Sequence, residues 1–341
     1  MKLKQLLIIV ALLLLNSCQK QQLFKQQYFI FGTIVEVLVW HDDEQMVNDA
    51  FIAVETELNK MHTQWHAWKK GNLNKINQAL RSGQTFDLNN EQVAFIKETK
   101  ALSQQSLGNF NPAMGELINL WGFHTDDYPI LTPPPNDKAI QLFLQRLPTM
   151  GDLQINGNLI SSSNPHIWLD YGGVAKGYAI DKAINILKQH KIENAIVNAG
   201  GDLRSIGSKG NKNWKVAIRK PNSADVLAVI NVKGDESIFT SGNYERYKEF
   251  NGKRYAHIID PKTGYGVEDI VSVTVIAENG TKADAAATAL IVAGTQNWQT
   301  VITSMQLDQV LMIRSDGSCL ATTKIMRRLT ESNLHCLEPK Y

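Results

Sequence analysis

The chain has 341 residues, of which 43% are hydrophobic and 20% charged, a composition typical of globular proteins and not of disordered ones. It carries 35 Lys and Arg against 33 Asp and Glu, so no surplus of either sign indicates a nucleic-acid partner or an acidic tail. Three cysteines are too few for a scaffold built on disulfides.

The N-terminus has the pattern of a bacterial lipoprotein leader. Two lysines precede an apolar run over residues 6–15, which is too short to span a bilayer but suits the core of a secretory signal. The run ends at Leu15-Asn16-Ser17-Cys18, which resembles a lipobox, in which the cysteine is acylated, for example by palmitate. We expect this anchor to hold the chain on the periplasmic side of a bacterial membrane, with a plain cleaved signal as the alternative. The predicted segments are a signal peptide over residues 1–17, a polar tether over 18–28 and a functional domain over 29–341.

In chain order, the first predicted element is a strand over residues 29–40, which are rich in β-branched and aromatic side chains. Apolar residues at helical spacing from Val47 to Met61 predict a helix with one buried face. Asn156-Gly157 predicts the turn of a hairpin over residues 153–160. Between these lie a predicted helix over 91–106, a proline-rich surface connection over 128–136 and a short helix over 140–147.

Strands predominate in the second half of the chain. They are predicted over residues 167–169, 195–197, 214–218, 226–232, 255–259 and 271–276, with helices over 175–189 and 283–292. This mixture predicts an α+β fold with a largely antiparallel sheet and packed helices.

A glycine-rich segment, Asp170-Tyr171-Gly172-Gly173-Val174-Ala175-Lys176-Gly177, connects a predicted strand to a predicted helix. Backbone N–H groups there can approach a phosphate closely, the helix N-terminus adds partial positive charge, and Lys176 could supply a full charge. The segment is neither a Walker sequence nor G-x-G-x-x-G, so a tight turn that needs glycine at positive φ is an equally good interpretation.

A second glycine pair lies in Asn198-Ala199-Gly200-Gly201-Asp202-Leu203-Arg204. Asp202 and Arg204 stand where a ligand could bind at a strand end. The alternative is a hairpin turn with a surface acid.

His257 lies near the end of a predicted strand, just before the turn-forming Asp260-Pro261. An imidazole titrates near neutrality and can accept a proton from a hydroxyl group. A histidine in an apolar strand is also often structural, so both interpretations stay open.

Asp284 and Thr288 are four residues apart in a predicted helix and therefore share one face. A carboxylate and a hydroxyl are hard oxygen donors that suit Mg²⁺. The alternative is an acid that favours the helix dipole, with a threonine that bonds back to a carbonyl.

Together, these segments resemble the FAD:protein FMN transferases, the ApbE-type flavin transferase lipoproteins. The resemblance runs from Phe31-Gly32-Thr33 to about Gly294. It rests on seven motifs in the same order: residues 106–112, 120–123, 172–178, 199–202, 240–244, 257–261 and 283–284.

The resemblance implies an ApbE-like α+β fold in which FAD lies in a cleft with Mg²⁺ at its pyrophosphate. The implied FAD contacts are Phe31, Trp68, Asn109, Phe110, Asn111, Asp170, Lys176 and Ile258. The implied Mg²⁺ ligands are the backbone carbonyl of Gly173, the carboxylate of Asp284 and the hydroxyl of Thr288.

The sequence departs from the family pattern at two positions. Asn111 stands where members usually have Asp, and Ala287 stands where some have a second Asp. The register of the aromatic after the first long helix is open, and we choose Trp68 over Trp65.

The resemblance further implies an enzyme that transfers FMN from FAD to a Thr or Ser hydroxyl of an acceptor protein, releasing AMP and leaving a phosphoester. His257 is the expected general base. Acceptors such as membrane respiratory redox subunits are implied, and a tether would keep the enzyme near them. The alternatives are an FAD-binding lipoprotein that does not transfer FMN and a Mg²⁺-dependent FAD pyrophosphatase. Cys319 and Cys336 could pair in an oxidising periplasm or remain free thiols.

Overall fold

The computed structural model describes residues 21–232, 234–330, 332 and 334–338. The predicted signal peptide and Cys18 lie outside these residues. Within the described part of the chain, no helix is both long and apolar enough to cross a membrane.

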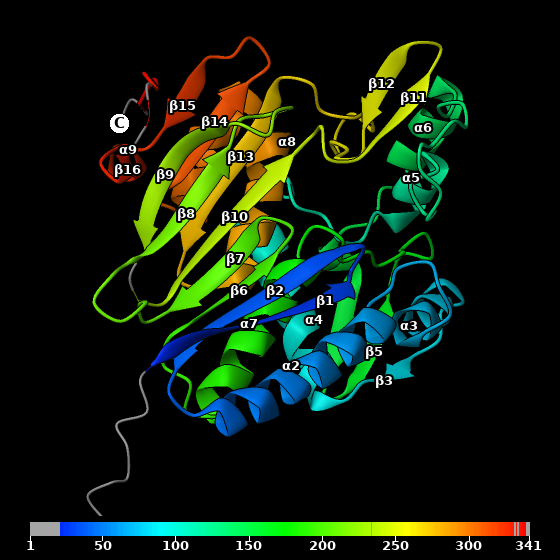
Figure 1. Ribbon diagram of the computed structural model, residues 1–341. Coiled ribbons are helices and arrows are strands. Elements are labelled where there is room, and N and C mark those ends of the chain that lie inside the picture. Colours follow the sequence, from blue (N-terminus) through cyan, green and yellow to red (C-terminus); the bar gives the residue numbers. More distant parts are fainter. Residues whose placement is uncertain (1–20, 233, 331, 333, 339–341) are drawn as a thin grey trace, which may run out of the picture.

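Most helices lie in the first half of the chain, and the strands β6 to β13 follow one another between α7 and α8 (Figure 1). The helices are α2 (Glu44–Gln64), α3 (Asn72–Arg81), α4 (Asn90–Gln105), α5 (Gly115–Leu120), α6 (Asp137–Leu144), α7 (Ala175–Gln189), α8 (Gly280–Ser304) and α9 (Thr323–Met326), with a 3₁₀ turn at Met150–Asp152. The large sheet holds, in spatial order, β1 (Gln22–Ile30), β2 (Thr33–His41), β6 (Ala195–Ala199), β7 (Asp202–Ile206), β10 (Glu236–Gly242), β13 (Ile270–Ala277), β14 (Val310–Arg314) and β15 (Cys319–Ala321). Three smaller sheets comprise β16 (Leu329–Thr330) with β9 (Val226–Val232) and β8 (Trp214–Arg219), β3 (Phe86–Asp87) with β5 (Leu159–Ser162) and β4 (Leu153–Asn156), and β11 (Tyr247–Phe250) with β12 (Lys253–Ala256).

The large sheet is covered on both faces, and its neighbouring strands all pair antiparallel. On one face α2 packs on β1 and β2, α7 on β6 and β7, and α8 on β10 and β13. The other face packs against β8 and β9. The alternating buried residues of β8, Trp214, Val216 and Ile218, belong to the same apolar cluster as Ile196 and Leu203 of the large sheet. This period-two burial is typical of antiparallel sheets, and the predicted α+β class is confirmed.

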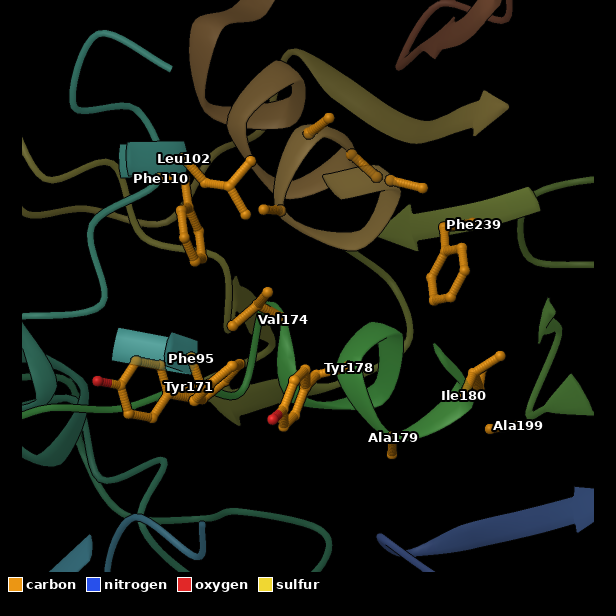
Figure 2. Close-up of a cluster of buried hydrophobic side chains, with 14 of the residues drawn as sticks. Phe95, Leu102, Phe110, Tyr171, Val174, Tyr178, Ala179, Ile180, Ala199 and Phe239 are labelled. Carbon is orange, nitrogen blue, oxygen red and sulfur yellow. The ribbon is translucent and has the colours of Figure 1, made fainter. Parts of the chain in front are cut away.

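The main core lies between the sheet and the helices, and α7 runs through its centre (Figure 2). Tyr178 on α7 stacks on Phe95 with ring centroids 4.2 Å apart, and Tyr171 lies against the same ring at 4.8 Å. These buried aromatics hold the start of α7 rigidly, which fixes the glycine-rich segment that leads into it.

The structure differs from the sequence prediction at the first strand. Residues 29–40 are not one strand but parts of the hairpin β1–β2, which turns at Phe31 and Gly32 with φ of 58° and 71°. A two-residue turn with both φ values positive matches the twist of a hairpin, and Gly32 alone was too weak a signal for it. Residues 22–28, which we assigned to the tether, are paired in β1 because Tyr28 can bury its ring against α2.

Other predicted elements shift in their bounds. The predicted strand over residues 167–169 is reduced to one bridge between Trp168 and Met114. The last predicted helix extends from Gly280 to Ser304 with a kink at Gly294. Cys319 and Cys336 form a disulfide, which resolves the alternative between paired and free thiols.

Candidate functional site

One pocket of about 560 Å³ lies where the β1–β2 turn, the N-terminus of α7, the first turns of α8 and the segment after β12 meet. Every residue predicted from the sequence as a catalytic, flavin or metal contact lines it. These residues are Phe31, Trp68, Asn109, Phe110, Asn111, Asp170, Gly173, Lys176, His257, Ile258, Asp284 and Thr288. Segments more than 200 residues apart in the sequence thus meet at one site.

The glycine-rich segment presents its backbone to this pocket just before α7. Asp170 Oδ1 accepts a hydrogen bond from the N–H of Gly172 at 2.8 Å, and its Oδ2 lies 2.8 Å from His124 Nε2. Burial is the largest single influence and raises the pKa of the Asp170 carboxyl, but the interaction with His124, the N–H of Gly172 and the nearby charge of Arg246 together outweigh it and lower the pKa. Asp170 is therefore a fixed negative charge on the pocket wall.

Lys176 extends from the first turn of α7 and pairs with the buried carboxylate of Asp202 on β7. Asp202 is held in turn by the N–H of Thr240, which donates to its Oδ1 at 2.8 Å. Burial opposes the charged form of Lys176, yet Asp202 and Asp284 together raise its pKa above the ordinary value. The ammonium group is thus permanently charged and lies on the pocket wall.

Asp284 and Thr288 line the pocket from the second and third turns of α8. Asp284 is 4% exposed, and its Oδ2 accepts a hydrogen bond from the N–H of Gly177 at 2.9 Å. The Thr288 hydroxyl lies close to Gly173, since a Cβ on that glycine would be 3.1 Å from Thr288 Oγ1. Gly173, Asp284 and Thr288 therefore line one pocket, with Thr288 next to Gly173.

The chemistry of this set fits a hard divalent cation. Burial raises the pKa of the Asp284 carboxyl to about 7. The neighbouring charges and hydrogen bonds therefore do not fully stabilise the ionised carboxylate in this position. Across the described residues, no three His, Cys, Asp or Glu side chains gather as a metal site, so a cation here would depend on one carboxylate and neutral oxygens. Mg²⁺ accepts such a set because it retains several waters and binds substrate phosphates.

His257 follows β12 directly and is turned toward the pocket. Its Nδ1 lies 2.8 Å from the carbonyl oxygen of Arg246, which can only accept, so Nδ1 carries the proton. Burial lowers the pKa of His257 to about 4, and the ring is therefore neutral near pH 7 with a free lone pair on Nε2. This is the protonation state of a general base.

Aromatic side chains form another part of the wall. Trp68 lines the pocket and stacks on His124 with centroids 5.1 Å apart, whereas Trp65 is buried in the core against Phe95. The choice of Trp68 over Trp65 as the residue facing the pocket therefore agrees with the structure. Phe31 reaches the pocket from the tight β1–β2 turn.

The two departures from the family pattern have local explanations. Asn111 Nδ2 donates to the carbonyl of Pro148 at 2.9 Å, which a carboxylate could not do, and its Oδ1 accepts from the N–H of Ala113 at 3.1 Å. Ala287 is wholly buried in the core and supplies no ligand.

The structure also assigns roles that the sequence did not indicate. Arg204 is not among the residues that line the pocket and pairs instead with Asp181 and Asp235, so it is not a ligand contact there. Asp202 is 3% exposed, so the alternative of a surface acid is wrong. Arg246 lines the pocket and donates to the carbonyls of Phe123 and Thr125. His124 follows the Leu120–Phe123 motif, and that neighbourhood was the only signal for it.

Comparison with known proteins places this geometry in context. The model of the ApbE family matches residues 31–312 of the chain. A protein of Rhodobacter capsulatus named FAD:protein FMN transferase is 38% identical over 89% of this chain. The matched region spans 58% of that relative's own length. A protein of the same name from Vibrio cholerae is 29% identical, with 91% of this chain and 94% of the relative covered.

Solved structures agree with the sequence matches. The crystal structure of the ApbE protein of Thermotoga maritima superposes with a TM-score of 0.82 at 30% identity, covering 91% of this chain and all of that one. The flavin transferase ApbE of Vibrio cholerae gives a TM-score of 0.79 at 28% identity, again over 91% of this chain.

Proposed function

The chain belongs to the ApbE family, and from this premise we propose that it is an FAD:protein FMN transferase. In this reaction a Thr or Ser hydroxyl of an acceptor protein attacks the FMN-side phosphorus of FAD. The bond to the AMP oxygen breaks, AMP leaves, and FMN remains on the acceptor through a phosphoester. The observation that carries the proposal is the convergence of all twelve predicted site residues on one pocket.

The pocket residues suit the binding of a pyrophosphate and a flat ring. The backbone of the Gly172-Gly173 segment and the N-terminus of α7 favour negative charge, and Lys176 adds a full positive charge. Gly173, Asp284 and Thr288 would hold Mg²⁺, which would neutralise charge on the pyrophosphate oxygens. Phe31, Trp68 and Phe110 offer aromatic surface for the isoalloxazine ring.

His257 is the proposed general base. Its protonated Nδ1 is fixed by the Arg246 carbonyl, so its Nε2 is the atom that can take the proton from the acceptor hydroxyl. The negative charge of bound FAD would raise the pKa of His257 from about 4 and make the imidazole a stronger base.

We also propose that an acyl group on Cys18 anchors the domain to the periplasmic side of a bacterial membrane. Support comes from the lipobox and from the Cys319–Cys336 disulfide, a bond that persists in oxidising compartments. The proposed partner is an acceptor flavoprotein such as a membrane respiratory redox subunit, near which an anchor raises the effective concentration of the enzyme.

A single reaction tests the proposal against its alternatives. The purified protein is mixed with FAD, MgCl₂ and a candidate acceptor domain, and the denatured acceptor is examined for flavin fluorescence in a gel. A fluorescent acceptor together with released AMP supports transfer, and an acceptor with valine in place of the target threonine is the control. AMP and free FMN without a labelled acceptor would identify a pyrophosphatase, and unchanged FAD would identify a carrier.

A further inference from the structure

Helix α8, which carries Asp284 and Thr288, and helix α7, which begins two residues after Gly173, are joined by a pair of matching contacts. On each helix a glycine is followed four residues later by an aspartate: Gly177 and Asp181 on α7, and Gly280 and Asp284 on α8. Asp181 Oδ1 accepts from the N–H of Gly280 at 2.8 Å, and Asp284 Oδ2 accepts from the N–H of Gly177 at 2.9 Å. Each aspartate therefore bonds to the glycine of the opposite helix.

These two N–H groups lie where a helix cannot satisfy them itself. Gly177 is the third residue of α7 and Gly280 the first of α8, and the first four N–H groups of a helix lack an acceptor within it. A negative charge at this end also interacts favourably with the helix dipole. Each aspartate thus caps the helix to which it does not belong.

Each aspartate can reach the N-terminus of the other helix because the two backbones are in contact at the crossing. A Cβ on Gly280 would come within 2.8 Å of the carbonyl oxygen of Gly177, so no side chain separates the two helices there. Backbones in direct contact leave the two helices little freedom to slide past each other.

The two halves of the crossing differ in their charge balance. Asp181 also accepts from Arg204 Nη1 at 2.5 Å and from the N–H and hydroxyl of Thr281 at 2.8 Å and 2.7 Å. The cation that acts on Asp284 is Lys176, and Lys176 forms its ion pair with Asp202. The Asp181 half is therefore saturated, while the Asp284 half faces the pocket with an oxygen available to a cation.

We propose that Asp181, held by Arg204, is a positioning residue that locks the α7–α8 crossing and so keeps the Asp284 carboxylate aimed at the cation. The identity of that cation as Mg²⁺ rests on the proposed function. The mechanical part of the inference, from Asp181 to Asp284, does not depend on it.

Amide exchange at Gly177, followed by NMR on the folded chain without FAD or Mg²⁺, reports this link directly, since its N–H is held by Asp284. In Asp181→Asn, Gly177 should exchange about tenfold faster relative to Leu187 of the same helix, the effect expected from one weakened bond to a charged acceptor. Unchanged relative exchange at Gly177 would overturn the proposal.

A matched control comes from the far end of α8. Asp269 Oδ2 accepts from the N–H of Thr295 at 3.0 Å, beyond the kink, so Asp269→Asn weakens a similar bond away from the crossing. This variant should leave Gly177 exchange unchanged, and an equal acceleration would mean general loosening and would contradict the proposal. If Asp181→Asn does not fold, Thr281→Val removes one of the Asp181 contacts and should accelerate Gly177 exchange about threefold.

The rise in Tm on titration with MgCl₂ separates the two proposals. We expect Asp181→Asn to need about tenfold more MgCl₂ than the wild type for the same rise, with Asp269→Asn unchanged. If the wild type shows no rise while Gly177 exchange still responds to Asp181→Asn, the Mg²⁺ part of the proposed function fails and the positioning role stands. A rise of equal midpoint in both proteins, with unchanged Gly177 exchange, would refute the positioning role alone.

Discussion

At the scale of single residues, His257 illustrates how burial and one hydrogen bond prepare a side chain for chemistry. The carbonyl of Arg246 fixes the tautomer, and burial lowers the pKa of the imidazole to about 4. Its position after β12 rather than within a strand leaves the ring at the edge of a rigid element, where functional groups commonly face a cleft.

We expect His257→Ala to lower the single-turnover rate of FMN transfer by about 10²–10⁴-fold, the usual contribution of a general base. FAD affinity should change little, because the base acts on the acceptor hydroxyl. FAD titration paired with single-turnover transfer measures both quantities. Weakened FAD binding with a proportional loss of transfer would instead indicate a structural histidine.

The pKa of His257 also predicts how transfer and the free energy of unfolding depend on pH. Because the pKa of His257 in the free enzyme lies at about 4, the ring stays in the neutral base form from pH 8 to pH 6, and kcat/KM for transfer, which reports the groups of the free enzyme, should not decline there through its protonation. The unfolded chain binds a proton on this residue near its ordinary pKa of 6.5, so the free energy of unfolding should decrease as the pH falls from 6.5 towards 4. A kcat/KM for transfer that falls as the pH is lowered through 6.5 would contradict this assignment.

Asp284 and Thr288 should contribute unequally to the affinity of the proposed site for Mg²⁺. Asp284→Ala removes the only carboxylate of the set and should raise the MgCl₂ concentration for half-maximal transfer by more than tenfold, whereas Thr288→Ala removes a neutral donor and should raise it less. Both effects are measured from transfer rates against MgCl₂ concentration. Near-normal activity of Asp284→Ala at low MgCl₂ would place the metal elsewhere.

At the scale of elements, the contact between α7 and α8 decides how the site is assembled. Gly177 N–H and the Asp284 carboxylate are 107 residues apart in the chain, yet they meet because both crossing positions are glycines. The β1–β2 turn also helps to assemble the site. The positive φ values of Phe31 and Gly32 reverse the chain beside the pocket and place Phe31 on its wall.

The effect of Gly177→Ala on the free energy of unfolding tests the close contact between α7 and α8, because an open helix and a crowded crossing predict opposite signs. In an open helix, this change would stabilise the protein by about 1 kcal/mol because alanine is the better helix former. Here the added Cβ would collide with the backbone of Gly280 and with Asp284, so we expect a loss of about 1–3 kcal/mol in the free energy of unfolding. Urea unfolding measures the difference, and a more stable variant would show that the helices can separate at no cost.

At the scale of the whole molecule, the C-terminal segment packs back on the edge of the large sheet and is joined to it covalently. The Cys319–Cys336 disulfide joins β15 to this segment, and Leu337 N–H donates to the carbonyl of Cys319 at 2.9 Å beside it. Strand β16 within the closed loop completes the sheet that covers the outer face of the large sheet.

Replacing both cysteines by serine should lower the free energy of unfolding by about 3 kcal/mol, the chain-entropy value for a loop of this length. Thermal unfolding with and without a reductant is the measurement. The reductant should lower the Tm of the wild type and leave that of Cys319→Ser/Cys336→Ser unchanged. A wild type insensitive to thorough reduction would argue against this contribution.

The proposed anchor predicts where the whole molecule is found. In Cys18→Ala, the acyl chains cannot attach, so the protein should move from the membrane pellet to the soluble periplasmic fraction. Fractionation with immunodetection checks this, with the wild type as the reference. Retention of the variant in the pellet to the same extent would refute the lipid anchor.

The sequence by itself determined the fold class, most helices and twelve of the residues that line the pocket. Helical periodicity and the Asn156-Gly157 turn are local signals, and α2, α4, α7 and the β4–β5 hairpin match them. Family motifs supplied the site residues, and all of them line the pocket.

Only the tertiary structure decided which side chains pair with which. Asp202 and Arg204 stand two apart on β7 and share a face, yet one pairs with Lys176 at the pocket and the other with Asp181 behind it. His124 reaches Asp170 across 46 residues. Such partners are set by where helices and strands cross, and residue spacing along the chain reports burial of a face but not the element that covers it.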